Sequence, residues 1–371
     1  MKFSISLSEF QQIIGRTMPA IPPKSTLPVL EHYLCTVAGG ILTLVATDQE
    51  LTIFASTPVT NEVAGKVLIP ARKLNDIVKA LGTEGLLQIS VNAQNLISLV
   101  TPFGKYAMNG LNYEDFPSIP TFPESDQIHF RQEDMLLIAT KTGFAVSTDE
   151  YRPAMTGVLF QFRGTEVRTA ATDSYRLSRV IIQNEAGDFP ADLDIIIPSR
   201  TIELLKKVDS GVDVYLTKTH AQFVFSNSTI ITRVIDERFP PYENVIPTDN
   251  DKAVAVNPKD LLSAIKRVAI FTSDTSKQIR FAAFNNTLTI SGEDDDSGSN
   301  ASESLSCDYT GTLFEIGFNY RYVVEALQHL VSDDNQAEVK FSFSSPTRAT
   351  LITPMRDENT LLMLVMPVRL A

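Results

Sequence analysis

Two aspartates in matching contexts are the first candidates for chemistry in this sequence. Asp48 stands in "LTLVATDQEL" and Asp173 in "VRTAATDSYRL", each directly after a threonine. Two carboxylates could perform general acid–base catalysis if their environments separated their pKa values. The matching contexts instead favour a repeated turn, in which each aspartate accepts hydrogen bonds from the backbone just beyond it. We therefore predict that both aspartates stabilise turns.

Other catalytic or metal-binding patterns are weak or missing. The sequence has neither GxxxxGK[ST] nor GxGxxG, so no phosphate-binding loop is expected. In "EDDDSGSNASES" (293–304), placing Gly298 at position six of an EF-hand loop puts Ser304 where a bidentate Glu is required, which favours a solvated loop. The histidines form no HExxH-type cluster; they are His32, His129, His220 and His329. We predict no catalytic residue, no metal and no cofactor.

Composition and charge narrow the class of protein. The chain has 371 residues, of which 43% are hydrophobic and 20% charged, and it has no apolar run of the roughly 20 residues that span a membrane. Glu9 interrupts the first residues, where a signal peptide would be apolar, and Cys35 and Cys307 are too few for a disulfide framework. We expect a cytoplasmic protein without a membrane partner, with both cysteines as buried small residues. The net charge of −12 argues against nucleic-acid binding, provided that the charge is evenly spread.

Internal similarity is the most informative feature of the chain. The segment "VLIPARKLNDIVKAL" (67–81) is echoed by "IIIPSRTIELLKKV" (195–208) and "FEIGFNYRYVVEAL" (314–327), and the spacing is close to one third of the chain. Each segment predicts a buried strand followed by an amphipathic helix, with Pro70, Pro198 and Phe318 at the start of the helix. We predict three domains, at 1–121, 128–247 and 248–371, with short polar joints near 121–127 and 247–253.

The elements that position these residues follow from periodicity. Helical spacing predicts six helices, at 7–18, 70–81, 131–146, 198–209, 257–271 and 319–330. Alternating segments between them, such as "LLQISV", "QFVFS", "IITRVI" and "EVKFSFS", predict antiparallel strands. The predicted fold class is α+β, with two helices packed on antiparallel sheet three times over. The apolar ending "TLLMLVMP" is then the last strand of a core.

Charge is divided unevenly between the predicted elements. The six helices carry 13 Lys/Arg and 8 Asp/Glu, a net of +5, which leaves −17 on the rest of the chain. A charged solvent face is usual for an amphipathic helix, so one such helix would mean little. Repetition across the thirds favours a mildly basic helical face in an acidic protein.

The motifs together resemble the DNA polymerase III beta subunit family, the bacterial sliding clamps. The segments that carry the resemblance span the chain: "TLPVL" (26–30), "IPARKL" (69–74), "ATDSYRL" (171–177), "RFPPYENVIP" (238–247) and "MPVRL" (366–370). The resemblance implies a non-catalytic processivity factor: a head-to-tail homodimer that closes a ring of clamp domains around duplex DNA, with helices lining the hole. It also implies binding of short peptides from the replicative polymerase, the clamp loader, and translesion and repair polymerases. A monomeric interaction scaffold that does not encircle DNA is the alternative.

The resemblance also assigns residues to three sites. We call the first set the client-peptide residues: Met155, Thr172, Ser174, Tyr175, Arg176, Leu177, Pro240, Asn244, Val245, Leu364, Met366, Pro367, Val368, Arg369 and Leu370. The DNA-contact residues are Lys24, Arg72, Lys73, Arg152 and Arg200 from the resemblance, and Lys206, Lys207, Lys266 and Arg267 from the predicted outer faces of the helices. The dimer-contact residues are Lys105, Tyr106, Met108, Ile270, Phe271 and Glu303. Tyr175 and Asn244 depart from the commonest family pattern, so the peptide preference is expected to differ, and Pro153-Ala154 replace a Tyr pair that some members carry.

Overall fold

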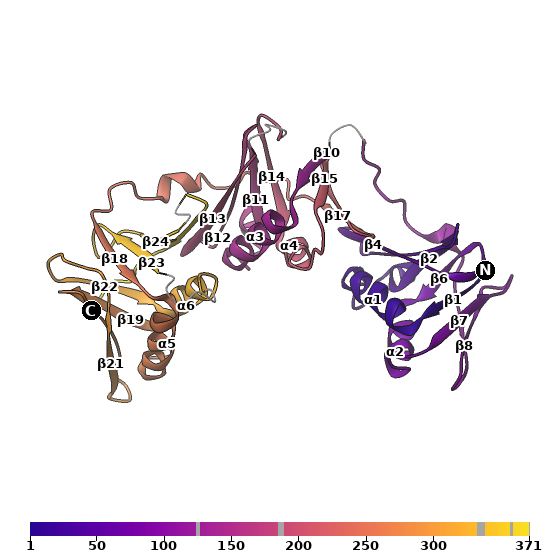
Figure 1. Ribbon diagram of the computed structural model, residues 1–371, viewed down its shortest axis with the longest axis horizontal. Helices are drawn as coiled ribbons and strands as arrows, with labels where there is room; N and C mark the ends of the chain where they lie inside the picture. The colour runs from indigo at the N-terminus through magenta and orange to yellow at the C-terminus, as the bar shows by residue number, and fades with distance from the viewer. Residues whose placement is uncertain (124–126, 185–188, 332–337, 357–358, 371) are drawn as a thin grey trace. The chain divides into compact units, whose positions relative to one another are not determined.

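The protein is described by a computed structural model that covers residues 1–123, 127–184, 189–331, 338–356 and 359–370. These residues form two compact units, which are described one at a time (Figure 1). The first unit consists of residues 1–133 and 208–234, and the second of residues 134–207 and 235 onward. The predicted joint at 121–127 includes residues 124–126, which lie outside the described residues.

The first unit contains two α-helices and two antiparallel sheets. Its elements are β1 (Lys2–Ser6), α1 (Leu7–Thr17), η1 (Met18–Ala20), η2 (Pro28–Glu31), β2 (His32–Ala38), β3 (Ile41–Thr47), β4 (Leu51–Pro58), β5 (Thr60–Val63), β6 (Gly65–Pro70), α2 (Ala71–Ala80), β7 (Leu86–Val91), β8 (Leu96–Thr101), β9 (Gly104–Asn109), η3 (Tyr113–Asp115), β10 (Gln127–Phe130), β15 (Val212–Leu216), β16 (His220–Phe225) and β17 (Ser228–Arg233). One sheet has the order β5-β1-β7-β8-β9, and the other has the order β10-β15-β16-β17-β4-β3-β2-β6.

The second unit contains the remaining helices and two further sheets. Its elements are α3 (Gln132–Thr142, which begins in the first unit), η4 (Gly143–Ala145), η5 (Pro153–Thr156), β11 (Gly157–Phe162), β12 (Glu166–Thr172), β13 (Arg176–Gln183), β14 (Leu193–Pro198), α4 (Ser199–Leu205), η6 (Tyr242–Val245), β18 (Lys252–Val256), α5 (Pro258–Val268), η7 (Ala269–Phe271), β19 (Gln278–Phe284), β20 (Thr287–Asp294), β21 (Ser299–Ser306), β22 (Phe314–Asn319), α6 (Tyr320–Gln328), β23 (Val339–Phe343), β24 (Thr350–Pro354) and β25 (Leu361–Val365). The sheet orders are β14-β11-β12-β13-β25-β24-β23-β18 and β21-β20-β19-β22.

The order of elements repeats three times along the chain. A strand and a helix are followed by four strands, a second helix and three strands, beginning at β1, β10 and β18, with β5 as an addition in the first repeat. In every repeat the four strands pair in the same pattern, as in β6-β2-β3-β4, β14-β11-β12-β13 and β22-β19-β20-β21. The prediction of an α+β unit written three times is confirmed.

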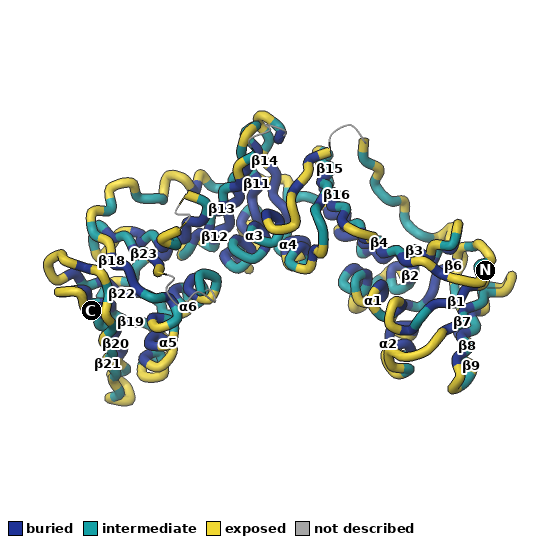
Figure 2. The backbone as a smooth tube through the Cα atoms, in the orientation of Figure 1, coloured by how far each residue is buried: buried dark blue, intermediate teal, exposed yellow. Residues whose placement is uncertain are grey.

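Continuous buried apolar runs form the strands that directly precede α2 and α4. Val67, Leu68 and Ile69 of β6 are fully buried, and the corresponding "III" of β14 is buried as well. A strand covered on both faces reads as a continuous apolar run rather than an alternating one. Figure 2 shows buried backbone along the strands and exposed backbone at the turns that join them.

The helix ends refine the sequence prediction. Asn257 caps α5 by accepting hydrogen bonds from the backbone N–H groups of Lys259 and Asp260, as the motif "NPKD" predicts. Pro70 and Pro198 occupy the cap positions before α2 and α4 rather than the first turn. The assignment of Phe318 to the same position was wrong, because Phe318 is buried in β22 and Asn319 caps α6.

The two compact units and the three sequence repeats divide the chain at different places. The strands β10, β15, β16 and β17 of the central repeat belong to the first unit, whereas β11 to β14 belong to the second. The reason is that two sheets continue from one repeat into the next, through the pairs β4–β17 and β13–β25. Because the backbone pairs across each joint, the two compact units do not coincide with the three repeats.

Candidate functional site

The apolar end of the chain forms a strand that joins two repeats. β25 pairs antiparallel with β13, which brings Leu364 opposite Leu177. All five residues of β25, Leu361–Val365, are buried. Complete burial of each large aliphatic side chain contributes about 1.5–3 kcal/mol, so this strand holds the joint firmly. The prediction that part of the tail is core is confirmed.

An apolar cluster lies beside this joint. It consists of Leu159, Ala170, Leu177, Ile196, Phe239, Tyr242, Ala349, Leu362 and Leu364, with Ala154, Ile235, Ile246 and Leu351 packed against it. Three exposed side chains adjoin it along the chain: Tyr175 is 58% exposed, Val245 is 53% exposed and Met366 is 36% exposed. The backbone N–H of Met366 donates to the carbonyl of Tyr175 at 2.8 Å, so these two meet at the edge of the joint. Exposed apolar side chains from three separate segments thus adjoin the buried cluster.

The Thr-Asp turns have the structure predicted from their repetition. The Oδ1 atom of Asp173 accepts hydrogen bonds from the N–H groups of Tyr175 and Arg176, at 2.9 and 3.0 Å. Asp48 accepts from the N–H groups two and three residues on in the same way. Ser174 has a positive φ of 80°, which this turn requires. The aspartates therefore shape the turns, and the turn at Asp173 presents Tyr175 to solvent.

Arg176 is held between aromatic rings and carboxylates. Its guanidinium lies 5.4 Å from the ring centroid of Phe144 and 5.2 Å from that of Tyr322 on α6. It forms ion pairs with Asp173 and Glu325. A cation between two ring faces is stabilised by both quadrupoles. The pairing of α6 with the start of β13 was not foreseen, because no sequence pattern links residues this far apart.

Two stacked ring pairs extend the same cluster. Tyr322 stacks on Tyr175 with centroids 5.9 Å apart and an interplanar angle of 10°, and Phe144 stacks on His329 at 4.2 Å and 17°. Burial, assisted by nearby Lys141, lowers the pKa of His329 to about 4. The imidazole is therefore neutral near pH 7, because burial and the nearby cations disfavour its charged form. Sequence reasoning missed Phe144, Tyr322, Glu325 and His329.

The loop before β11 brings two predicted sites together. Arg152 pairs with Asp149 at 2.8 Å and donates from Nη1 to the Oγ of Ser174 at 2.7 Å. That hydroxyl also lies 3.8 Å from the sulfur of Met155, which is 5% exposed. Arg152, assigned to DNA from the resemblance, thus contacts a client-peptide residue.

The remaining client-peptide residues divide between two places. Pro240, Asn244 and Val245 belong to the segment around η6, where the side chains of Asn244 and Val245 are exposed. The last described residues lie along β22, where Val368 forms a bridge with Gly317. A Cβ atom on Gly317 would come within 2.8 Å of the Leu370 side chain, so glycine permits this close approach. Pro367 and Leu370 are half-buried and Arg369 is exposed.

The DNA-contact residues of the first unit lie at the start of α2 and the loop beside it. Arg72 and Lys73 are exposed, and Arg72 Nη2 donates to the carbonyl of Pro22 at 3.0 Å. Lys24 is exposed in the same loop, two residues beyond Pro22. The hydrogen bond fixes this loop against α2, so the three cations occupy neighbouring positions.

The DNA-contact residues of the second unit are less uniform than predicted. Arg200, Lys207 and Lys266 are exposed. Lys206 is not, because α4 ends at Leu205 and the Lys206 side chain is only 25% exposed and pairs with Glu203 at 2.6 Å. Arg267 makes two hydrogen bonds to Glu303, at 2.7 and 2.6 Å. The structure thus joins Arg267, assigned to DNA contact from its predicted helix face, to Glu303, assigned to the dimer by the resemblance.

The dimer-contact residues lie on two sheet edges and one short helix. Lys105, Tyr106 and Met108 belong to β9, at the end of the five-stranded sheet, and Glu303 belongs to β21, at the end of the four-stranded sheet. In η7, Ile270 is 77% exposed and Phe271 is 42% exposed. An unpaired edge strand is a template for pairing with another chain.

The described residues include neither a metal-binding cluster nor a membrane-spanning helix. No group of three or more His, Cys, Asp or Glu side chains in this part of the chain is placed to hold a metal ion. Among the helices described, none is long and apolar enough to cross a membrane. Cys35 is buried, which raises its thiol pKa to about 12, whereas Cys307 is only partly buried, contrary to expectation.

The chain matches three domain families in succession. Residues 1–120 match the N-terminal domain of the DNA polymerase III beta subunit, residues 129–241 its central domain, and residues 243–369 its C-terminal domain.

Full-length relatives and solved structures agree with this match. The beta sliding clamp of Pseudomonas aeruginosa is 27% identical over 369 residues, covering 96% of this chain and all of the relative, and that of Bacillus subtilis is 27% identical with full coverage of both. The crystal structure of the Pseudomonas aeruginosa sliding clamp bound to griselimycin has a TM-score of 0.92 at 26% identity, and that of the Bacillus subtilis clamp has 0.91 at 26%, each covering both chains completely. The chain therefore belongs to the DNA polymerase III beta subunit family, the ring-shaped, non-catalytic sliding clamps that encircle DNA and tether the replicative polymerase as processivity factors.

Proposed function

We propose that two copies of this chain close the ring by pairing β21 of one copy with β9 of the other. The support comes from the two joints inside the chain, β4–β17 and β13–β25, which use the corresponding strands. β21 is the third-repeat counterpart of β4 and β13, and β9 is the first-repeat counterpart of β17 and β25. A third joint of the same kind makes the association head to tail, and the dimer-contact residues then lie on both sides of it.

The internal joints also supply the register of the pairing. Beyond the Thr-Asp turn, the first residue that pairs back across the turn is Thr52 of β4 in the first repeat and Leu177 of β13 in the second. Across the two joints, Thr52 lies opposite Ile231 of β17, and Leu177 lies opposite Leu364 of β25. The equivalent residue in the third repeat is Asn300, which pairs with Glu293 across the longer turn. Counting from the two-residue hairpins that precede β9 and β17, Ile231 corresponds to Ala107. Asn300 then lies opposite Ala107, and Ser302 opposite Lys105.

Cross-linking tests this register. In a Cys307→Ser background, the pair Ser302→Cys and Lys105→Cys should form a covalent dimer of twice 41.0 kDa under mild oxidation, because directly opposed side chains lie about 4.5–5.5 Å apart. The control pair Ser306→Cys and Lys105→Cys is displaced along the strand and should cross-link poorly. A stronger product from the control pair would overturn the register.

The client-peptide surface is proposed at the joint of β13 and β25. The observation that carries it is the apolar cluster beside this joint, with Tyr175, Val245 and Met366 exposed around it. Short peptides bind where a few apolar anchors can be buried among adaptable side chains such as Met. We propose the clamp loader and the translesion and repair polymerases as further clients of this surface, beside the replicative polymerase.

The DNA-contact residues are proposed to line the hole of the ring. With the observed helix bounds, the six α-helices carry ten Lys/Arg and seven Asp/Glu, a net of +3 in a chain of net −12. A mildly basic lining contacts phosphates without reading sequence, and few contacts keep the salt dependence small, as sliding requires. We also propose the three-domain division at 1–121, 128–247 and 248–371, and the bacterial cytoplasm as the location, where chromosomal DNA is replicated.

A further inference from the structure

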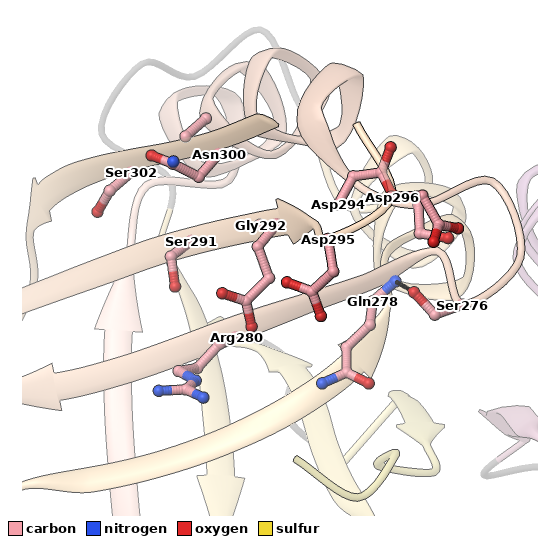
Figure 3. A pocket seen from close by; sticks show the side chains of 13 residues that line it. Ser276, Gln278, Arg280, Ser291, Gly292, Asp294, Asp295, Asp296, Asn300 and Ser302 are labelled. Atoms are coloured by element: carbon pink, nitrogen blue, oxygen red, sulfur yellow. Dashed lines mark hydrogen bonds between the residues drawn. The ribbon is translucent and has the colours of Figure 1, made fainter. Parts of the chain in front are cut away.

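A polar pocket of about 540 Å³ lies where β20 ends and β21 begins, beside the turn that joins these two strands of the third repeat. Figure 3 shows Arg280, Ser291 and Ser302 on neighbouring strands, and Asp294, Asp295 and Asp296 where the chain turns. The strand register places Arg280 beside Ser291 and Ser291 beside Ser302. The pocket therefore lies on three paired strands and the turn that joins two of them, and one of these strands, β21, is the edge proposed above to pair with β9 of a second copy.

The repeats identify what this pocket corresponds to. Arg280 pairs with Ser291 as Leu159 pairs with Ala170 in the second repeat. Glu293 pairs with Asn300 as Thr172 pairs with Leu177. Leu159, Ala170 and Leu177 belong to the apolar cluster of the proposed client-peptide surface. The pocket is the same place in the next repeat.

At the corresponding place in the second repeat, a segment of this chain is packed. Phe239 and Tyr242 lie in the apolar cluster, and Ile235 donates its N–H to the carbonyl of Ile196 on β14. The position thus accommodates a polypeptide segment laid across the strands. In the third repeat the pocket lining includes no residue of such a segment within the described chain.

The chemistry of the pocket is opposite to that of its counterpart. Arg280, Ser291 and Asn300 replace Leu159, Ala170 and Leu177, so aliphatic side chains would lose their contacts there. The lining contributes four successive carboxylates, Glu293–Asp296, and one guanidinium, that of Arg280, which itself lies 3.7 Å from Glu315. The proposed register adds Lys105 of the partner subunit opposite Ser302, so the carboxylates still outnumber the cations. The excess of negative charge favours a cationic occupant.

We propose that this pocket is a second docking site, which takes an extended segment rich in Lys or Arg from a partner protein. The inference rests on the proposed peptide-binding role of the second repeat, whose counterpart position it occupies. It gives the clamp two peptide sites of different chemistry, an apolar site at the β13–β25 joint and an acidic site over β19–β21. A partner that carries both kinds of segment would be held at two points.

Binding of a basic probe to the full-length dimer tests the proposal. A fluorescein-labelled peptide of alternating Lys and Ser should bind, measured by anisotropy at an ionic strength of about 0.1 M. Asp295→Asn/Asp296→Asn should weaken binding about tenfold. Arg280→Leu should strengthen binding about threefold, because Arg280 is the only cation that the described residues of a single copy contribute to the pocket lining.

A matched control separates the pocket from the general negative charge. Asp236→Asn/Glu237→Gln makes the same change of charge at exposed residues outside the pocket, and it should change the affinity by less than about twofold. Equal losses in the two double variants, or no binding at all, would overturn the proposal.

A second variant separates this proposal from the proposed function. Val245→Asp should abolish binding of the clamp-binding peptide of the replicative polymerase while leaving the Lys-Ser probe bound. If Val245→Asp leaves the polymerase peptide bound, the proposed client-peptide surface fails. If the polymerase peptide displaces the Lys-Ser probe, the second site fails.

Discussion

Arg176 links two repeats through its side chain. Its side chain is 12% exposed, and the guanidinium contacts ring faces from Phe144 and Tyr322 together with the carboxylates of Asp173 and Glu325. Because Tyr322 also stacks on Tyr175, the position of the exposed Tyr175 ring depends on α6. The proposed peptide surface is therefore built from both repeats at the level of single side chains.

Replacing Arg176 tests this link. Arg176→Met should lower the free energy of unfolding by about 2 kcal/mol, because it removes two cation–π contacts and leaves two carboxylates without their partner. Arg369→Met, at an exposed residue of the tail, should change it by less than about 0.5 kcal/mol. Urea unfolding of both variants provides the comparison, and equal stabilities would contradict the role of Arg176.

The neutral state of His329 predicts a pH effect. Its pKa is lowered from 6.5 to about 4, with burial as the main cause, so between these values the unfolded chain binds a proton that the folded chain does not. Lowering the pH from about 6.5 to about 4 should therefore destabilise the natural protein relative to His329→Phe, which keeps the stacked ring but cannot titrate. The difference in melting temperature should be constant above pH 7. A difference that does not change with pH would contradict the buried neutral state.

At the scale of elements, periodicity predicted the architecture well. The six helices begin and end within four residues of their predicted bounds, and β7 coincides with "LLQISV". These elements were predictable because their apolar spacing is local information. Internal repetition extended this to the order of elements, since a motif that occurs three times carries its structure with it.

What could not be predicted depends on contacts between distant segments. Lys206 was expected to be exposed, but an early end of α4 and the Glu203 carboxylate hold it half-buried. Arg267 carries a helix-face pattern, yet its partner Glu303 lies on a strand 36 residues away. The Phe144–Arg176–Tyr322 stack joins three elements that no spacing rule connects. The resemblance supplied the client-peptide residues, but it gave no sign of the polar pocket in the third repeat.

The tail after β25 offers a test at the same scale. Deleting residues 367–371 removes the segment along β22 but leaves the buried strand Leu361–Val365; Ala371 lies outside the described residues. Client-peptide affinity should fall at least about tenfold, because apolar anchors dominate such binding. The dimer should persist, since β9 and β21 are untouched. An unchanged peptide affinity would remove the tail from the client-peptide surface.

At the scale of the whole molecule, three repeats use one kind of joint. Two of these joints are internal, and each repeat end that is not paired internally offers the complementary strand. A ring follows when a second copy supplies the missing pairing, which is closure by a heterologous interface. A monomeric scaffold would leave β9 and β21 as open edges, which natural proteins usually protect.

Retention on DNA tests encirclement most directly, because a ring is held by topology and not by the strength of its phosphate contacts. The protein loaded on closed circular DNA should remain bound through extensive washing in salt, and it should be released when a single double-strand cut makes the same DNA linear. Loss at equal rates from circular and linear DNA, or retention on linear DNA with free ends, would contradict the account of this chain as a sliding clamp.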